Sequence, residues 1–215
     1  MTLEEYKKKY TEEDAVGWDC IDTVVEKIYP EQNPQHYAPK LPYALGGTEP
    51  IDGISVYNSN LQEPHFHYIS YGFSELYYNE ESVGEEYSKL GFELTFRLKK
   101  YSDEDNVNWA CNLIQNLGKY VFSKEKWFEE YHVIPANGPI RSNYNTDITA
   151  LAFVIDKELG ILNTPHGEVQ FLQMVGLTNT EYEELKQNPS TTKTKELLDK
   201  LKQNNPLLIT DLERK

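Results

Sequence analysis

Cysteine is scarce in this sequence, and long apolar runs are absent. Its 215 residues include two cysteines, Cys20 and Cys111, and no CxxC pair, so neither a zinc knuckle nor a redox motif is supported. No apolar run approaches the roughly 18 residues of a membrane span. The first residues, MTLEEYKKKYTEED, lack the apolar core of a signal peptide. We therefore expect a cytoplasmic protein without membrane contact.

Basic residues are also few, with 21 lysines and arginines against 35 acidic residues and a net charge of −14. Nucleic-acid binding and anionic membrane surfaces both need basic surface, so the composition argues against both. A basic protein partner is compatible with this charge, because complementary charge speeds encounter. Solubility alone is the alternative explanation of the acidic balance.

Motifs of catalysis are missing as well. The sequence contains no G-x-S-x-G elbow, no GxxxxGK[ST] phosphate loop and no GxGxxG turn. Cys111 lies at mid-helix apolar spacing, which is typical of a core thiol. Acidic residues are too numerous for a catalytic pair to be distinguished. We expect a protein that is not an enzyme and needs no cofactor.

Aromatic residues are abundant, at 13% of the chain with 16 tyrosines, whereas hydrophobic residues make up only 39%. A tyrosine buries a large apolar ring and keeps a hydroxyl at its edge. Such a surplus can fill a core and also suits a surface for protein recognition.

Alternating and helical patterns predict the main elements. Strands are expected at 53–59, 65–78 (interrupted by Gly72), 91–100, 148–156 and 168–177. In the segment 91–100, Phe92, Leu94, Phe96 and Leu98 share one face, and Glu93, Thr95, Arg97 and Lys99 share the other. This pattern predicts one buried and one solvated sheet face. The helix at 106–122 is expected to pack on the buried face.

Further helices are predicted at both ends of the chain. Thr11 to Asp14 resembles a capping box before a helix that Pro30 ends, Thr180 and Glu183 form a second box, and a short helix is expected at 195–203. The segments 30–47 and 79–90 are predicted loops, and turns are predicted at 158–160 and 164–167. The order of elements predicts an α+β fold: a single domain with a central mixed or antiparallel sheet flanked by helices.

His65 and His67 are the candidate metal ligands. Residues two apart on a strand face the same side, so both imidazoles could reach one ion. A metal site needs at least a third ligand, and the next acid, Glu75, follows Gly72. We expect instead that these histidines form hydrogen bonds with neighbouring tyrosines or backbone. A metal protein or enzyme that uses His65 and His67 is the third hypothesis for function.

Several segments in unbroken order resemble the suppressor-of-fused domain. They are PIDGISVY (50–57), PHFHYISYGFSELYY (64–78), GFELTFRL (91–98), WACNLIQNLGKYVF (109–122), GPI (138–140) and EVQFLQMVGLTNTEYEEL (168–185). The combination H-x-HY…YG-x-SELY followed by GFELTFRL is specific, although no single piece is. The resemblance covers about residues 15–185, and we expect a suppressor-of-fused-like domain at 1–187. Outside the resemblance, the residues at 188–215 predict a polar break, a short helix and a C-terminal tail.

The resemblance implies an α+β fold, no catalytic activity and binding of a protein partner. It places Tyr68 and Glu75 near the ligand-contacting side. Stand-alone bacterial members are similar to immunity proteins, so the leading hypothesis is a protein that neutralises a cognate toxin with a basic surface, such as a nuclease. The second hypothesis is a regulatory or scaffold module with an unrelated protein partner. No cofactor, metal or nucleic acid is expected.

Overall fold

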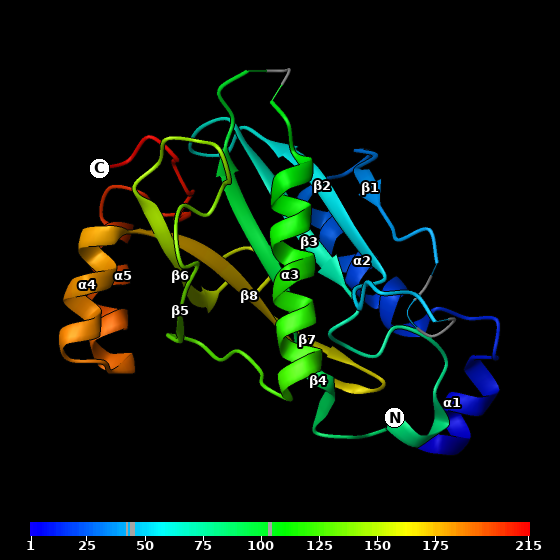
Figure 1. Ribbon diagram of the computed structural model, residues 1–215. Helices are drawn as coiled ribbons and strands as arrows, with labels where there is room; N and C mark the ends of the chain where they lie inside the picture. Colours follow the sequence, from blue (N-terminus) through cyan, green and yellow to red (C-terminus); the bar gives the residue numbers. More distant parts are fainter. Residues whose placement is uncertain (42, 44–45, 103–104) are drawn as a thin grey trace.

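A mixed sheet of eight strands forms the centre of the computed structural model, which describes residues 1–41, 43, 46–102 and 105–215 (Figure 1). The strand order is β1-β2-β3-β4-β8-β6-β5, and β7 pairs with β8 outside this path. Among the strands of the described chain, β4 and β8 alone pair in parallel; the other strand pairs are antiparallel. The strands are β1 (Gln35–Tyr37), β2 (Gly53–Ser59), β3 (His65–Tyr71), β4 (Tyr87–Lys99), β5 (Val133–Pro135), β6 (Ile148–Ile155), β7 (Ile161–Thr164) and β8 (Gly167–Thr178).

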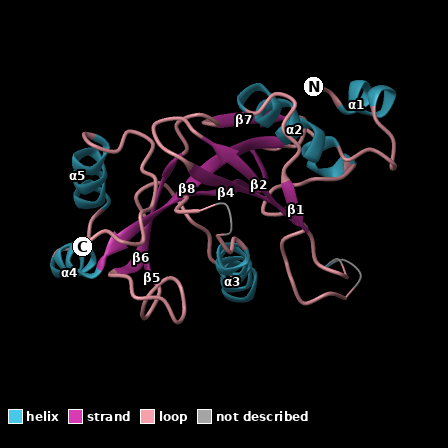
Figure 2. Cartoon of the chain, turned by 90° about the horizontal axis from the view of Figure 1, so that it is seen from above, coloured by secondary structure: helices cyan, strands magenta, loops and turns pink. Residues whose placement is uncertain are grey.

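Helices cover both faces of this sheet. They are α1 (Leu3–Lys9), α2 (Val16–Ile28), the 3-10 turn η2 (Glu80–Ser82), α3 (Asn108–Lys124), α4 (Asn179–Gln187) and α5 (Thr191–Lys202). Seen from above, α3 lies on one side of the sheet and α2 on the other, while α4 and α5 lie at the end that carries β5 and β6 (Figure 2). The predicted α+β fold with a mixed sheet in one domain is confirmed. Within the described ranges, none of the helices is both long and apolar enough to span a membrane.

The apolar face of β4 packs against α3 as the alternation predicts. Phe92, Leu94, Phe96 and Leu98 are all buried in one cluster, together with Ile114 of α3. The helix contributes its apolar stripe because residues three and four apart share one side. This contact forms the larger part of the core.

The opposite face of β4 is also buried, so the prediction of a solvated face is wrong. Glu93, Thr95 and Arg97 are each 0% exposed. Apolar residues of α2 form a second cluster on β3 and β8, and a third cluster joins α4 and α5 to β6 and β8. Alternation failed as a guide here because the polar side chains of β4 are satisfied by buried partners.

Several strands and loops begin or end at other residues than predicted. Strand β3 ends at Tyr71 rather than 78, since Gly72 has a φ of 140°. The predicted loop 79–90 contains η2 and the start of β4 at Tyr87. The expected turns at 158–160 and 164–167 flank a strand the patterns missed, β7. The predicted loop 30–47 contains β1, and its residues 42, 44 and 45 lie outside the described chain.

The helix starts also differ from the predicted capping boxes. Thr178, not Thr180, caps α4, and Glu181 completes the reciprocal pair. Asp14 does accept a hydrogen bond from the Thr11 backbone, but α2 begins only after Ala15, and α1 precedes it without a predicted counterpart. Polar residues at neighbouring positions make equally good caps in sequence, which explains these shifts.

The C-terminal segment is inserted into the sheet at the end of the β4–β8 pairing. The backbone of Thr210 bonds to both Arg97 and Lys99 of β4, and its hydroxyl accepts a hydrogen bond from Gly176 of β8. Leu207, Leu208, Ile209 and Leu212 are buried. The last residues therefore fill the opening where the two parallel strands diverge.

Candidate functional site

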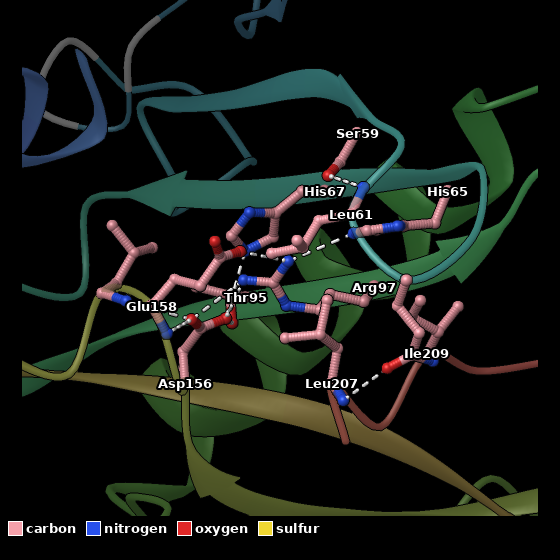
Figure 3. A network of polar contacts seen from close by, with 12 residues as sticks. Ser59, Leu61, His65, His67, Thr95, Arg97, Asp156, Glu158, Leu207 and Ile209 are labelled. Atoms are coloured by element: carbon pink, nitrogen blue, oxygen red, sulfur yellow. Dashed lines mark hydrogen bonds and ion pairs between the residues drawn. The ribbon is translucent and has the colours of Figure 1, made fainter. Parts of the chain in front are cut away.

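The face of β3 that carries the two candidate histidines belongs to a buried polar network (Figure 3). Its centre is an ion pair between Arg97 of β4 and Asp156, which follows β6, with Nη2–Oδ1 at 3.0 Å. Asp156 Oδ2 also accepts a hydrogen bond from the Thr95 hydroxyl at 3.0 Å. Arg97 Nη1 lies 2.9 Å from a carboxylate oxygen of Glu158. The network thus joins two strands to the turn after a third.

Both histidines are fully occupied by protein partners. A carboxylate only accepts, so His67 donates through Nε2 to Asp156 at 3.1 Å and accepts at Nδ1 from the Tyr29 hydroxyl at 2.8 Å. A guanidinium only donates, so His65 Nε2 accepts from Arg97 at 3.1 Å and its Nδ1 donates to the Glu63 carbonyl at 2.8 Å. The expected bonding to tyrosine and backbone is confirmed. Within the described ranges, no three His, Cys, Asp or Glu side chains are grouped to hold a metal.

The ionisation of these groups follows from their burial and partners. Burial lowers the pKa of His65 to about 4. Burial, followed by the nearby charge of Arg97, lowers the pKa of His67 as well. Burial alone would raise the pKa of Asp156, but the charges and hydrogen bonds of His67 and Arg97 outweigh it and hold that pKa well below its ordinary value. The arrangement is therefore a buried Arg97–Asp156 ion pair beside two neutral imidazoles, with the Glu158 carboxylate also in contact with the guanidinium.

A second buried carboxylate, Glu93, fixes the turn after β3. It accepts hydrogen bonds from the hydroxyls of Ser70 and Ser74, at 2.5 and 2.6 Å, and from the backbone of Gly72 and Ser74, both at 2.9 Å. A Cβ on Gly72 would lie 2.9 Å from the Asp52 nitrogen, so glycine is needed on steric grounds too. Gly72 and Ser74 of the motif YG-x-S are thus explained by structure, because both are partners of one buried acid, whereas the Tyr71 hydroxyl donates to Asp22.

The two predicted partner-binding residues lie in different environments. Tyr68 is 0% exposed, and its hydroxyl donates to the Val107 carbonyl at 3.3 Å on the α3 side of the sheet. Glu75 is partly exposed, and its carboxylate accepts from the Asn79 amide at 3.0 Å. The structure does not bring the two side chains together. Their role in binding stays a prediction, and the partly exposed Glu75 fits that role better than the buried Tyr68.

The surface offers a groove at the edge of the sheet. Strand β5 ends the strand order, and in the described chain no strand pairs with its outer side. A cavity of about 570 Å³ runs beside it, with the C-terminal end of α3 on one wall and α4 with the start of α5 on the other. Its lining includes Tyr120, Trp127, Tyr131, Ile134 and Tyr182. The side chain of Trp127 is mostly exposed.

Sequence patterns did not predict this groove. The apolar and aromatic residues that line it are scattered over α3, the segment 126–134 and α4, so no local pattern unites them. Arg97 and Asp156 were missed for a related reason, because they lie 59 residues apart and their pairing depends on the parallel contact of β4 with β8. An alternating strand pattern was itself evidence for exposure of Arg97.

Comparison with known proteins places the chain in a family. Residues 47–215 match the family model described as suppressor of fused protein (SUFU). The Homo sapiens and Mus musculus suppressor of fused homologs are each 34% identical over 210 residues, covering 92% of this chain but 43% of the relative. The chain belongs to the suppressor of fused family. It spans less than half the length of these curated relatives.

Solved structures agree with this assignment. The protein in the Sufu-Fu complex crystal structure superposes with a TM-score of 0.83 at 30% identity, covering 94% of this chain and 91% of that one. Drosophila Suppressor of Fused gives 0.82 at 30% identity, covering 95% of this chain and 52% of that one. A SUFU homolog from Neisseria gonorrhoeae gives 0.59 at 12% identity, covering 93% of this chain and 95% of that one, which shows a shared fold alone.

Proposed function

We propose that this chain is a non-enzymatic protein-binding domain whose partner adds an extended segment to the outer edge of β5. The observation that carries the proposal is the unpaired β5 edge, which lies beside an aromatic groove between two helical walls. An exposed strand edge presents backbone groups that a partner strand can pair with. Pockets on either side then select the side chains of the added strand.

The composition of the groove suits a binding anchor. Trp127 and Tyr120 are exposed, at 58% and 41%, so a large part of each ring can contact a partner. Tryptophan and tyrosine are enriched among the residues that contribute most to interface energy. The domain of similar extent in the Sufu-Fu complex structure comes from a complex with another protein, which supports partner binding as a property of this fold.

We further propose that the partner is a protein with a basic surface, and that a cognate toxin neutralised by this chain is the leading candidate. The net charge of −14 supports a basic partner. The alternative is a regulatory or scaffold role with an unrelated partner, which the likeness to the Sufu-Fu complex favours. Growth rescue by co-expression with a toxin encoded nearby would distinguish the two.

The test of partner binding is cross-linking in the native cell with the tagged chain and two variants. Trp127→Ala should lose the cross-linked partner, because it removes the exposed anchor beside β5 while leaving the core intact. Leu61→Ala is the control, since Leu61 is similarly exposed, at 54%, in the loop between β2 and β3. Equal recovery of the partner by both variants would show that the groove is not the binding site.

A further inference from the structure

A second, larger cavity adjoins the β5 groove. It has a volume of about 920 Å³ and lies between the first residues of β4, the segment 127–131 and β7. The two cavities share four lining residues: Trp127, Phe128, Tyr131 and Thr191. A partner segment that leaves the β5 edge can therefore continue past Trp127 into the second cavity without leaving the surface.

Exposed apolar side chains gather around this second cavity. Tyr87, Trp127 and Ile161 line it and are each about half exposed, at 49%, 58% and 51%. They come from β4, the loop after α3, and β7. Large apolar side chains that cluster on a surface mark an interaction site more often than scattered ones do.

Negative charge surrounds the same side chains. Glu129 and Glu130 line the cavity. Glu168 of β8 is the register partner of Tyr87 of β4, so the two side chains lie on the same side of the sheet. Glu86 directly precedes Tyr87, and its charge, followed by burial and the charge of Glu168, raises the pKa of Tyr87. Glu86 and Glu168 are also joined by a backbone hydrogen bond of 3.0 Å.

The lysine in the lining of this cavity is directed elsewhere. Lys89 is the one lysine or arginine among the lining residues of the described chain. Its ammonium donates to the Gly72 carbonyl at 2.7 Å and lies 5.1 Å from the centre of the Phe122 ring. Among the described residues, the carboxylates of Glu86, Glu129 and Glu168 form no ion pair with a lysine or arginine. Glu129 lies 3.3 Å from His132 Nε2, and Glu168 accepts a hydrogen bond from the Gln170 amide at 3.0 Å.

One aromatic ring and one carboxylate of the lining are already held together. The indole nitrogen of Trp127 donates to Glu129 at 2.9 Å. A guanidinium stacks on an aromatic face and pairs with carboxylates through its planar fork, whereas an ammonium offers only a point charge. This pairing favours arginine over lysine as the ligand.

From the exposed rings, the surrounding carboxylates and the continuity with the β5 groove, we infer that the second cavity binds an arginine side chain of the protein partner. The arginine lies on the segment next to the strand that pairs with β5. The inference rests on the proposed function and names the chemistry of the partner at this site.

The test uses random 12-residue peptides displayed on phage and selected on the full-length chain. Peptides whose binding is lost with Tyr182→Ala are retained, because Tyr182 lines the β5 groove and not the second cavity. We expect an arginine at one fixed position relative to the apolar residues of these peptides. Replacing that arginine with glutamine should weaken binding about tenfold or more, and lysine should restore it only in part.

A charge-neutral triple variant provides the second measurement. This variant combines Glu86→Gln, Glu129→Gln and Glu168→Gln. Each substitution keeps the size of the side chain, and the amide oxygen at position 129 can still accept the hydrogen bond from the Trp127 indole. They should weaken the arginine peptide about tenfold but leave its glutamine version unchanged. The matched control removes three other exposed glutamate charges, at Glu26, Glu31 and Glu213, and should leave both peptides unaffected.

The outcomes separate the inference from the function on which it rests. The arginine site would be wrong if peptides that need Tyr182 carry no arginine at a fixed position, or if they bind the triple variant as well as the wild type. The β5 groove would still be supported in both cases. Equal weakening by the control triple would assign the effect to overall charge and also overturn it. If no selected peptide depends on Tyr182, the proposed groove itself fails, and the inference fails with it.

Discussion

Arg97 and Asp156 form an ion pair in which both side chains are 0% exposed, with Nη2–Oδ1 at 3.0 Å. Charges without access to water are tolerated only when hydrogen-bonding partners surround them. Asp156 has such partners in Thr95, His67 and the backbone of Glu158. The pair therefore connects β4 to the end of β6. An apolar contact at this position would leave the neighbouring histidines without these hydrogen-bond partners.

The first prediction concerns that pair. Asp156→Asn keeps the shape of the side chain but leaves the Arg97 charge buried without its main partner. Removing one member of a buried pair costs about 3–5 kcal/mol of unfolding free energy, which urea denaturation can measure. Asp199→Asn, which breaks the exposed pair with Lys195, is the control and should change the midpoint little. Similar losses from the two variants would show that burial of the Arg97 pair has no special cost.

Stability should fall as the pH drops from about 6.5 to 4. The unfolded chain protonates its histidines near pH 6.5, whereas the pKa of His65 in the folded chain is lowered to about 4 and that of His67 is also lowered. Between these values the unfolded state binds more protons, so the free energy of unfolding decreases with falling pH. Above pH 6.5 these histidines contribute no pH dependence.

Two carboxylates modify this profile. The lowered pKa of Asp156 adds a further loss of stability as the pH falls below about 4, since its unfolded form protonates there first. Burial raises the pKa of Glu93, although its hydrogen bonds act to lower it. Above about pH 4.5 the folded chain therefore binds this proton more readily than the unfolded chain, so Glu93 partly offsets the loss of stability caused by the histidines. Thermal melts of the wild type and His65→Gln should show a shallower slope between pH 6.5 and 4 in the variant. An unchanged slope would exclude His65 as a source.

The packing of β4 on α3 gives a third prediction. Leu94→Ala should cost about 2–5 kcal/mol, because it leaves a cavity in a fully buried cluster. Leu61→Ala, at an exposed position, should cost far less. Unfolding midpoints in urea compare the two variants directly. A small loss from Leu94→Ala would mean that the core collapses around the cavity.

The same strand shows how far the sequence predicts this fold. Alternation along β4 locates the strand and its α3-facing residues correctly, because a period of two is a local property of the backbone. It fails for Glu93 and Arg97, since their burial depends on Ser70, Ser74 and Asp156, which the fold brings from other segments. The β5 groove could not be predicted for the same reason, because its walls come from three separate parts of the chain.

Deleting residues 204–215 should prevent stable folding. The deletion removes Leu207, Leu208, Ile209 and Leu212, all buried. At about 1.5–3 kcal/mol for each buried side chain, the loss is comparable with the 5–15 kcal/mol of a typical domain. Near-UV circular dichroism should lose its signal, whereas removal of the exposed Lys215 alone should preserve it. A folded deletion variant would support the division of the chain at residue 187.

The last prediction concerns how the proposed partner is captured. If a basic surface meets this chain of net charge −14, the association rate should fall steeply with added salt, while the dissociation rate changes little. Salt screens charges at a distance and so slows the encounter, but the short contacts of a formed complex are screened much less. Stopped-flow mixing at about 0.03 to 0.5 M salt measures both rates once a partner is in hand. The Glu86, Glu129 and Glu168 triple variant should flatten the salt dependence more than the control triple at Glu26, Glu31 and Glu213. If the association rate does not depend on salt, the electrostatic part of the proposal is wrong. Binding at β5 would be unaffected, because it is argued from the strand edge and the groove.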